Sequence, residues 1–265
     1  AEKRERDTHT DKRQRDGAMH GRKRRGKDAP AIPQAELDKK ATKLRLYTKL
    51  SNAVIALRAA TAAAAGTTRA SAAGSNGGAE GAEAQSEKQQ EKYDGMVLNA
   101  LKATAKMAVV NPDFYSLWNL RRDLLTEQVQ ALRVAASAGV SESDSCEATS
   151  KLHSISQTEL ALTQAALTKR NPKCYYAWHH RKWVVSLGYV DLSEELELCE
   201  NFLARDERNF HCWTYRRCVL AALATPASAE LAFTDALIAR NFSNGSAWHQ
   251  RTRVLLHEIP AREAL

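Results

Sequence analysis

The sequence predicts an all-α protein built as an α-solenoid, in which antiparallel helix pairs stack one on the next. Two observations support this fold class. Apolar residues recur with the spacing of amphipathic helices over most of the chain, and one short string of residues recurs four times. A repeat of this kind can bury its apolar face only against its neighbours. Stacked repeats therefore share one continuous core and present an extended concave surface.

Composition excludes several classes of protein. The chain has 265 residues, 43% of them apolar, which allows one or two domains with a sizeable core. Its mean hydropathy is -0.49, and no apolar run approaches the roughly 20 residues of a membrane span. The polar first thirty residues do not resemble a secretory signal. The five cysteines form neither a disulfide framework nor a Cys-x-x-Cys metal pair. We therefore expect a cytoplasmic protein that does not span a membrane.

The net charge of +8 is concentrated near the N-terminus. Residues 1–30 hold 11 Lys and Arg against 6 Asp and Glu, and no aromatic residue lies among the basic residues of 22–27. Sequence-specific nucleic-acid binding needs a basic surface on a folded domain, so we do not expect nucleic acid as a partner. Pro30 and Pro33 disfavour helix. We predict a disordered basic extension over 1–33 and a helical repeat domain over 34–265.

The repeat domain is predicted to begin with a helix and then an insertion. Apolar residues from Leu37 to Leu57 fall on one helix face. From Arg58 to Lys92, no apolar side chain is larger than alanine, and five glycines cluster with polar residues. Such a segment buries too little surface to order itself, so we predict a flexible insertion at about 66–90. Helical periodicity returns at Tyr93.

Each of the four recurring strings places Asn or Asp seven residues before a Trp and Arg three residues after it. The strings are 111–121, 171–181, 206–216 and 241–251, and their Trp residues are Trp118, Trp178, Trp213 and Trp248. These Trp residues are 60, 35 and 35 residues apart, so the first interval exceeds one period by 25 residues. We assign that excess to a second flexible insertion, a Ser-rich acidic loop at about 136–151.

Amphipathic segments between the strings complete one helix pair in each period. We expect the Asn of a string, where Pro follows it, to cap the second helix of its pair. Trp and the Arg three residues later share a helix face. The ring can therefore pack between neighbouring pairs while the guanidinium reaches a carbonyl or carboxylate. We expect the four Trp residues to be scaffold rather than chemistry.

The pattern of Asn-Pro, five residues, Trp, two residues and Arg resembles the repeat of protein prenyltransferase α subunits. Tetratricopeptide repeats have a similar period but carry Leu-Gly shortly after their Trp, where this sequence has Arg121, Arg181, Arg216 and Arg251. The strings look most like the type II branch of the family, the Rab geranylgeranyltransferases, and the resemblance covers about 93–255. The family commonly has further helical repeats, so we expect the sequence to be a fragment or a short form.

The resemblance implies the non-zinc α subunit of an αβ heterodimer. Such an enzyme moves a geranylgeranyl group from geranylgeranyl diphosphate to C-terminal cysteines of Rab GTPases, which a Rab escort protein presents. The resemblance also implies that zinc belongs to the prenyltransferase β subunit, and that this chain binds no cofactor or metal of its own. The histidines agree, because the adjacent His179 and His180 point about 100 degrees apart on a helix.

The resemblance further implies two catalytic residues, Lys173 and Tyr175. In the family, a Lys five residues before the repeat Trp and a Tyr three residues before it approach the diphosphate, and only the second string here has both. Such groups neutralise the charge that grows on the leaving diphosphate. Without the resemblance, Lys173 is one exposed lysine in a turn. Two alternatives stay open: the α subunit shared by farnesyl and type I enzymes, and a non-catalytic helical scaffold.

Overall fold

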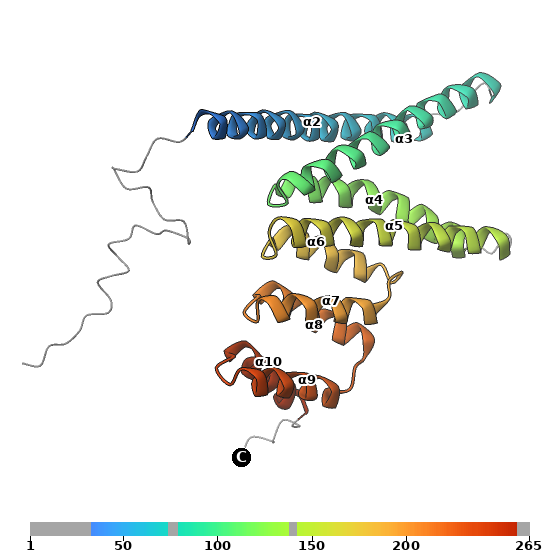
Figure 1. Cartoon of the computed structure of the whole chain (residues 1–265). Helices are drawn as coiled ribbons and strands as arrows, with labels where there is room; N and C mark the ends of the chain where they lie inside the picture. Colours follow the sequence, from blue (N-terminus) through green and yellow to red (C-terminus); the bar gives the residue numbers. More distant parts are fainter. Residues whose placement is uncertain (1–32, 74–78, 138–141, 259–265) are drawn as a thin grey trace, which may run out of the picture. The chain divides into compact units, whose positions relative to one another are not determined.

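The computed structural model describes residues 33–73, 79–137 and 142–258, and within these ranges all the regular elements are α-helices. The predicted disordered extension lies, except for residue 33, outside the described residues. The all-α prediction is confirmed (Figure 1). The helices are α2 (Gln34–Ala73), α3 (Ala79–Val110), α4 (Tyr115–Ser137), α5 (Glu142–Lys169), α6 (Tyr175–Ser186), α7 (Leu192–Arg205), α8 (Phe210–Leu223), α9 (Ala227–Arg240) and α10 (Gly245–Glu258).

The chain forms two compact units, 1–46 and 47–265. In the first unit, the described residues are the start of α2, and every side chain there is exposed. The second unit holds the rest of α2 and all helices from α3 to α10. No helix in the described part of the chain contains an apolar stretch that could span a lipid bilayer.

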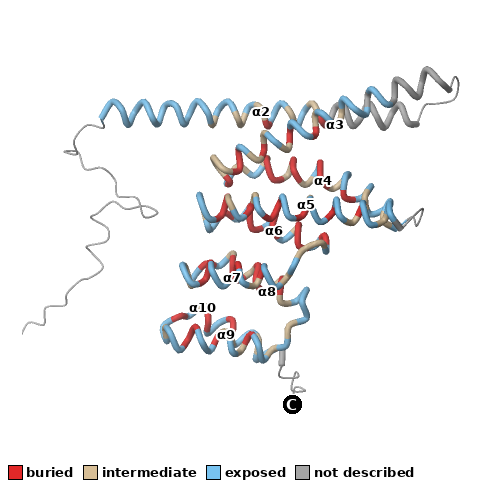
Figure 2. Tube along the Cα trace, turned by 45° about the vertical axis from the view of Figure 1, so that its right-hand side comes forward, coloured by how far each residue is buried: buried red, intermediate tan, exposed pale blue. Residues whose placement is uncertain are grey.

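Within the second unit, the helices pack as four pairs: α3 with α4, α5 with α6, α7 with α8, and α9 with α10. A short turn joins the two helices of each pair, which makes them antiparallel. One apolar core extends from Val54 on α2 to Ala247 on α10 and draws buried residues from every pair. Figure 2 shows the buried residues distributed along all of these helices. The α-solenoid prediction is confirmed.

The four repeated Trp residues hold the turns between paired helices. Each indole Nε1 donates a hydrogen bond to the backbone carbonyl six residues earlier, at 2.7 to 2.9 Å. Trp118, Trp178 and Trp213 are buried, whereas Trp248 in the last pair is 39% exposed. The ring fills space between helices while its one polar group fastens the turn. These contacts agree with the predicted role of the Trp residues as scaffold.

The repeated Asn or Asp opens each turn, but it does not cap the following helix as predicted. In all four turns its Oδ1 accepts a hydrogen bond from the backbone N–H two residues later. Helix α6 begins instead after Cys174 and α8 after Asn209, whose side chains accept from Ala177 N–H and Cys212 N–H. The side chains of Asn and Asp imitate a backbone turn in this way, so an Asx turn precedes each second helix.

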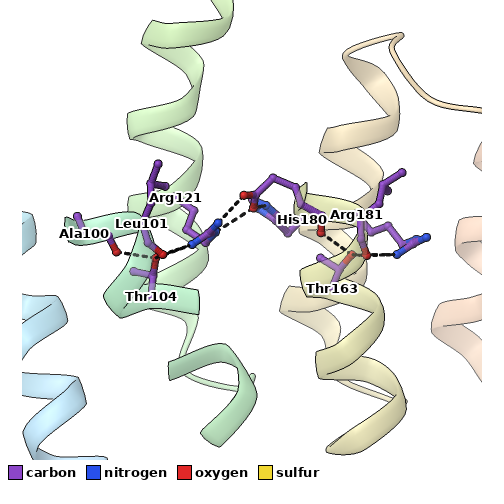
Figure 3. A network of polar contacts seen from close by, with 9 residues as sticks. Ala100, Leu101, Thr104, Arg121, Thr163, His180 and Arg181 are labelled. Atoms are coloured by element: carbon purple, nitrogen blue, oxygen red, sulfur yellow. Dashed lines mark hydrogen bonds and ion pairs between the residues drawn. The ribbon is translucent and has the colours of Figure 1, made fainter. Parts of the chain in front are cut away.

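A buried arginine–glutamate ladder joins each helix pair to the next. Arg181 on α6 donates two hydrogen bonds of 2.6 Å to Glu195 on α7, and its Nη1 reaches the Leu160 carbonyl and Thr163 on α5. Figure 3 shows Arg121 with its partners and, beside it, Arg181 next to Thr163. The expected contact of the guanidinium with a carbonyl or carboxylate is confirmed. The buried ladder pairs are Arg121 with Glu159, Arg181 with Glu195, and Arg216 with Glu230.

Each ladder glutamate receives a further hydrogen bond from the second helix of its own pair. The donor stands two residues after the repeated Trp and differs each time. It is His180 to Glu159 at 2.9 Å, Tyr215 to Glu195 at 2.5 Å, and Gln250 to Glu230 at 3.0 Å. The first pair carries buried Ala100 and Leu120 at the two corresponding positions. Glutamate and donor therefore occur together, because a buried carboxylate needs its full set of partners.

Charge states in the ladder follow from burial and these contacts. Burial alone would raise the pKa of Glu159, but hydrogen bonds from His180 and Arg121 outweigh it and lower the pKa to about 2. Burial lowers the pKa of His180, against the opposing effect of Glu159. His180 is therefore neutral, with its proton on the Nε2 that faces the carboxylate. Its buried Nδ1 has no hydrogen-bond partner within the described ranges.

The two predicted insertions are largely helical. Helices α2 and α3 cover 66–73 and 79–90, whereas 74–78 lie outside the described residues, and the flexibility of 66–90 stays a prediction. The described residues of the insertion predicted at about 136–151 are helical and not a loop, because α4 continues to Ser137 and α5 begins at Glu142. Residues 138–141 lie outside the described residues, and the flexibility of this insertion also stays a prediction. From 142 to 151 there is neither Gly nor Pro to stop a helix. The extra residues of the first interval lengthen α4 and α5 to 23 and 28 residues, against 12 in α6.

Candidate functional site

The turns between paired helices follow one another along one edge of the second unit, which we call the turn edge (Figure 1). It consists of residues 111–114, 171–174, 206–209 and 241–244. Side chains tie neighbouring turns together. Asn171 Nδ2 donates to the Asp113 carboxylate at 3.0 and 3.1 Å, and Asn241 Nδ2 donates to the Glu207 carboxylate at 2.8 and 2.9 Å. These contacts fix the position of each turn relative to the one before it.

Lys173 lies in the second of these turns. Its backbone N–H donates to Asn171 Oδ1 at 3.0 Å, and its Nζ lies 2.9 Å from Asp206 Oδ2 in the third turn. The Lys173 side chain is 59% exposed. The hydrogen bond from Lys173 lowers the pKa of Asp206, so this carboxylate is ionised at neutral pH. The structure thus places a directed ammonium group on the surface of the turn edge.

Tyr175 is the first residue of α6 and is 55% exposed. Its ring stacks on His179 with a centroid separation of 5.7 Å and meets Tyr176 and His211 edge-on at 5.4 and 5.9 Å. Both predicted residues therefore lie where the second turn becomes α6. Their predicted catalytic role is not tested by this arrangement and stays a prediction.

Rings continue beyond Tyr175 to form an aromatic ribbon along the starts of α4, α6 and α8. Tyr115 contacts Tyr176 at 5.9 Å, and Phe210 contacts His211 at 5.6 Å. Five of the six rings of this ribbon are exposed, and Phe210 is the most exposed of its Tyr and Phe rings at 69%. The ribbon consists of Tyr115, Tyr175, Tyr176, His179, Phe210 and His211. An exposed row of large rings of this kind is typical of a binding surface.

Cations lie beside the aromatic ribbon. Burial lowers the pKa of Arg122, although the guanidinium stays charged at neutral pH. Burial also lowers the pKa of His179, and the positive charges of Arg122 and Lys182 lower it further. His179 is therefore a neutral ring between fixed cations. Arg122, Lys182 and Lys173 thus place positive charge near the starts of α4 and α6, with Lys173 paired to the Asp206 carboxylate.

The described residues offer no metal centre, and two of their buried thiols are poor nucleophiles. Among them, no group of three or more His, Cys, Asp or Glu is arranged to hold a metal ion. All five cysteines are free. Burial raises the pKa of Cys174 to about 12, and Cys212 together with burial raises the pKa of Cys199. A thiol with a raised pKa is a poor nucleophile. The expectation that zinc is held by another subunit stays a prediction.

Sequence reasoning missed two parts of this site. The first is Asp206 as the partner of Lys173, which lies one repeat further along the chain. The sequence did contain a signal for Asp206. The residue seven positions before Trp is Asn in three of the strings, and it is Asp only in the third string, which follows the string with Lys173. The second is the aromatic ribbon, whose members look unremarkable in each string separately. Aligning the strings places an aromatic ring three residues before Trp in the first three of them.

Curated proteins from animals and a plant are similar to part of this chain. The chain is 42% identical over 112 residues to the geranylgeranyl transferase type-2 subunit alpha of Bos taurus, and 41% identical over 112 residues to that of Homo sapiens. Each match covers 42% of this chain and 17% of the relative. The geranylgeranyl transferase type-2 subunit alpha 2 of Arabidopsis thaliana is 35% identical over 106 residues, 39% of this chain and 13% of the relative. The matched stretch therefore spans less than a fifth of these relatives.

A family model described as the protein prenyltransferase alpha subunit repeat matches four times. The matches are 97–128, 156–187, 192–223 and 227–258. Each match falls on one helix pair, from α3 with α4 through to α9 with α10. Each also contains one repeated Trp with its turn and its Arg. With one such repeat on each of its four helix pairs, the chain belongs to the protein prenyltransferase alpha subunit repeat family.

Proposed function

We propose that this chain is the α subunit of a heterodimeric Rab geranylgeranyltransferase. The enzyme would transfer a geranylgeranyl group from geranylgeranyl diphosphate to C-terminal cysteines of Rab GTPases in the cytoplasm. One observation carries the proposal: Lys173 and Tyr175 are both exposed at the start of α6, where the aromatic ribbon runs. The relatives named geranylgeranyl transferase type-2 subunit alpha support the choice of lipid donor.

The chemistry of prenyl transfer explains why these groups suit the task. A thiolate sulfur bonds the first carbon of the prenyl chain while the bond from that carbon to the diphosphate oxygen breaks. Negative charge grows on the departing diphosphate. Lys173 supplies positive charge and N–H donors to it, the Tyr175 hydroxyl supplies a further donor, and the N-terminus of α6 favours an anion. Such contacts raise the rate because they strengthen as the charge develops.

Two features of the described residues bear on the partners of the proposed enzyme: they offer no ligand set for zinc, and they expose the aromatic ribbon. Zinc, which would make the substrate thiol available as a thiolate, is proposed to lie on the β subunit, since the described part of the chain offers no ligand set for it. The aromatic ribbon fits a protein interface, because exposed Tyr and Phe side chains are enriched there. We assign it to contact with the β subunit, and Rab would arrive bound to its escort protein.

The test is co-expression with a candidate β subunit, followed by transfer of radiolabelled geranylgeranyl to a Rab tail presented by the escort protein. We expect transfer with both subunits and none with this chain alone. Lys173→Ala should lower the single-turnover rate about one hundred to one thousandfold, the cost of one lost charge-assisted donor. Heterodimer assembly should be intact, because Lys173 lies on an exposed turn.

Lys169→Ala is the matched control, since it removes an exposed lysine one turn away from the same surface. It should leave the rate unchanged. Transfer to a short C-terminal box peptide instead of the Rab tail would favour the α subunit of a farnesyl or type I enzyme. Failure to co-purify with any β subunit would favour a non-catalytic scaffold. An unchanged rate for Lys173→Ala would remove this residue from the mechanism.

A further inference from the structure

The contacts between successive turns follow a rule. The residue seven before each Trp uses its Oδ1 to accept from its own turn. Its second terminal atom is then directed back to the turn before. For Asn171 and Asn241 that atom is Nδ2, a donor, and the preceding turn supplies a carboxylate, Asp113 or Glu207. Donor and acceptor are matched at both junctions.

The junction at Lys173 reverses this polarity. Asp206 Oδ1 accepts from the Arg208 N–H at 3.1 Å, as in the other turns, and Oδ2 faces Lys173 Nζ at 2.9 Å. With Oδ1 held by the turn, an Asn at this position would direct its NH₂ group at the ammonium, donor against donor. The chain therefore carries Asp here and Asn at the other three positions. The substitution pairs one specific carboxylate with one specific lysine.

The geometry leaves most of the ammonium available. A lysine ammonium has three N–H donors, and Asp206 accepts one of them. The carboxylate is fixed by its own turn and 33% exposed, whereas the lysine side chain is 59% exposed. A long flexible side chain is thus held at its tip by the Asp206 carboxylate, while more than half of the side chain stays exposed to solvent. This arrangement orients the Lys173 ammonium and still leaves it N–H donors with which to bind an anion.

We propose that Asp206 is a positioning residue for Lys173: it holds the ammonium at the turn before α6, where the leaving diphosphate of the proposed transfer reaction would collect charge. This inference rests on the function proposed above. Asp206 itself would not touch the diphosphate, because two anions repel. Its effect should therefore appear in the rate of transfer and not in the affinity for the prenyl diphosphate.

The experiment compares Asp206→Asn with Glu207→Gln in the αβ complex. Both replacements remove one carboxylate charge from the same turn, but Glu207 faces Asn241 and not Lys173. Asp206→Asn should lower kcat about tenfold, less than Lys173→Ala, because the ammonium is still present but no longer held. KM for geranylgeranyl diphosphate should stay unchanged or fall, since a repelling charge is gone. Glu207→Gln should change neither value, and Asp206→Glu should restore part of kcat.

A second measurement uses this chain alone and does not depend on prenyl transfer. Acetylation of Lys173 by acetic anhydride, followed by mass spectrometry with Lys169 as internal reference, reports how firmly the ammonium is held. Asp206→Asn should speed it about two- to fivefold, in line with the small free energy of an exposed ion pair. Glu207→Gln should not. Equal acetylation rates in both variants would overturn the ion pair itself.

The kinetic outcomes separate this inference from the proposed function. If Lys173→Ala slows transfer and Asp206→Asn does not, Asp206 is only a link between turns and the inference is wrong. If both carboxylate variants lower kcat equally, the effect is structural and the inference is again wrong. If Lys173→Ala itself has no effect, the catalytic assignment of Lys173 fails and the positioning role fails with it.

Discussion

The repeats carry two kinds of ion pair that both run from one helix pair to the next, one in the core and one on the turn edge. The side chains of Arg181 and Glu195 are only 2% and 3% exposed, whereas those of Lys173 and Asp206 are 59% and 33% exposed. A buried pair has a large desolvation cost and is stable only with every partner in place. An exposed pair contributes little and opens at little cost. The comparison shows two uses of an ion pair in the same repeat. The buried pair stabilises the stacking of helix pairs, and the exposed pair orients a lysine on the surface.

The largest predicted effect comes from breaking the buried ladder. Arg181→Ala should lower the free energy of unfolding by about 3 to 5 kcal/mol, because it leaves Glu195 buried without its guanidinium partner. Arg251→Ala is the matched control in the last repeat, where the guanidinium pairs with the 61% exposed Asp235. That change should cost less than about 1 kcal/mol. Urea unfolding of both variants measures the difference, and similar losses would contradict the assigned contrast between core and surface.

The stacking of helix pairs could be predicted from the sequence because its signals are local. Trp and Arg stand three residues apart on one helix, and their offset recurs four times. The ladder glutamates were not predictable in the same way. Each ladder glutamate is followed by leucine, but that dipeptide is too common to mark a buried carboxylate, and the partner of Glu195, Arg181, lies on a different helix. Only the stacked structure brings the carboxylate and the guanidinium together.

The candidate site also contains residues that the sequence identified and one residue that it did not. Lys173 and Tyr175 were identified by resemblance of one string to a family, and the structure adds that both lie at the start of α6. Asp206 was not identified, because its role arises from contact between two turns 33 residues apart in the chain. The helix over 142–151 was not predicted for a different reason: serine and acidic residues were interpreted as a loop, although no Gly or Pro interrupts α5 there.

A second, smaller effect is expected from the Trp residues that fasten the turns. Trp118→Phe removes the indole donor from the buried carbonyl of Pro112 and leaves a small void, which should cost about 1 to 3 kcal/mol. Trp248→Phe removes the same hydrogen bond from the carbonyl of Phe242, which is exposed enough for water to replace the indole. Its cost should be less than half as large. If the unfolding midpoints of Trp118→Phe and Trp248→Phe fall equally, the loss of stability comes from the hydrogen bond and does not depend on how far the Trp is buried.

The smallest effect concerns pH and the neutral donor His180. Burial lowers the pKa of His180 in the folded chain, whereas an unfolded histidine titrates near about 6.5. Below that pH the unfolded chain binds a proton that the folded chain does not, so stability is lost as pH falls from about 6.5. The slope is at most about 1.4 kcal/mol per pH unit for one proton. The pKa of Glu159 is about 2, so its own contribution is lost only in a more acidic range.

His180→Gln separates this titration from the hydrogen bond. Gln250 already donates to Glu230 at 3.0 Å from the corresponding position of the last repeat, so glutamine can serve the same carboxylate without titrating. The variant should lose less stability than the native chain between pH 7 and 5.5, measured by urea unfolding at each pH. His249→Gln, on the exposed face of α10, should keep the native slope. If the difference between native and His180→Gln stability stays constant over this range, His180 does not titrate on unfolding, and the ladder owes its pH response to its carboxylates alone.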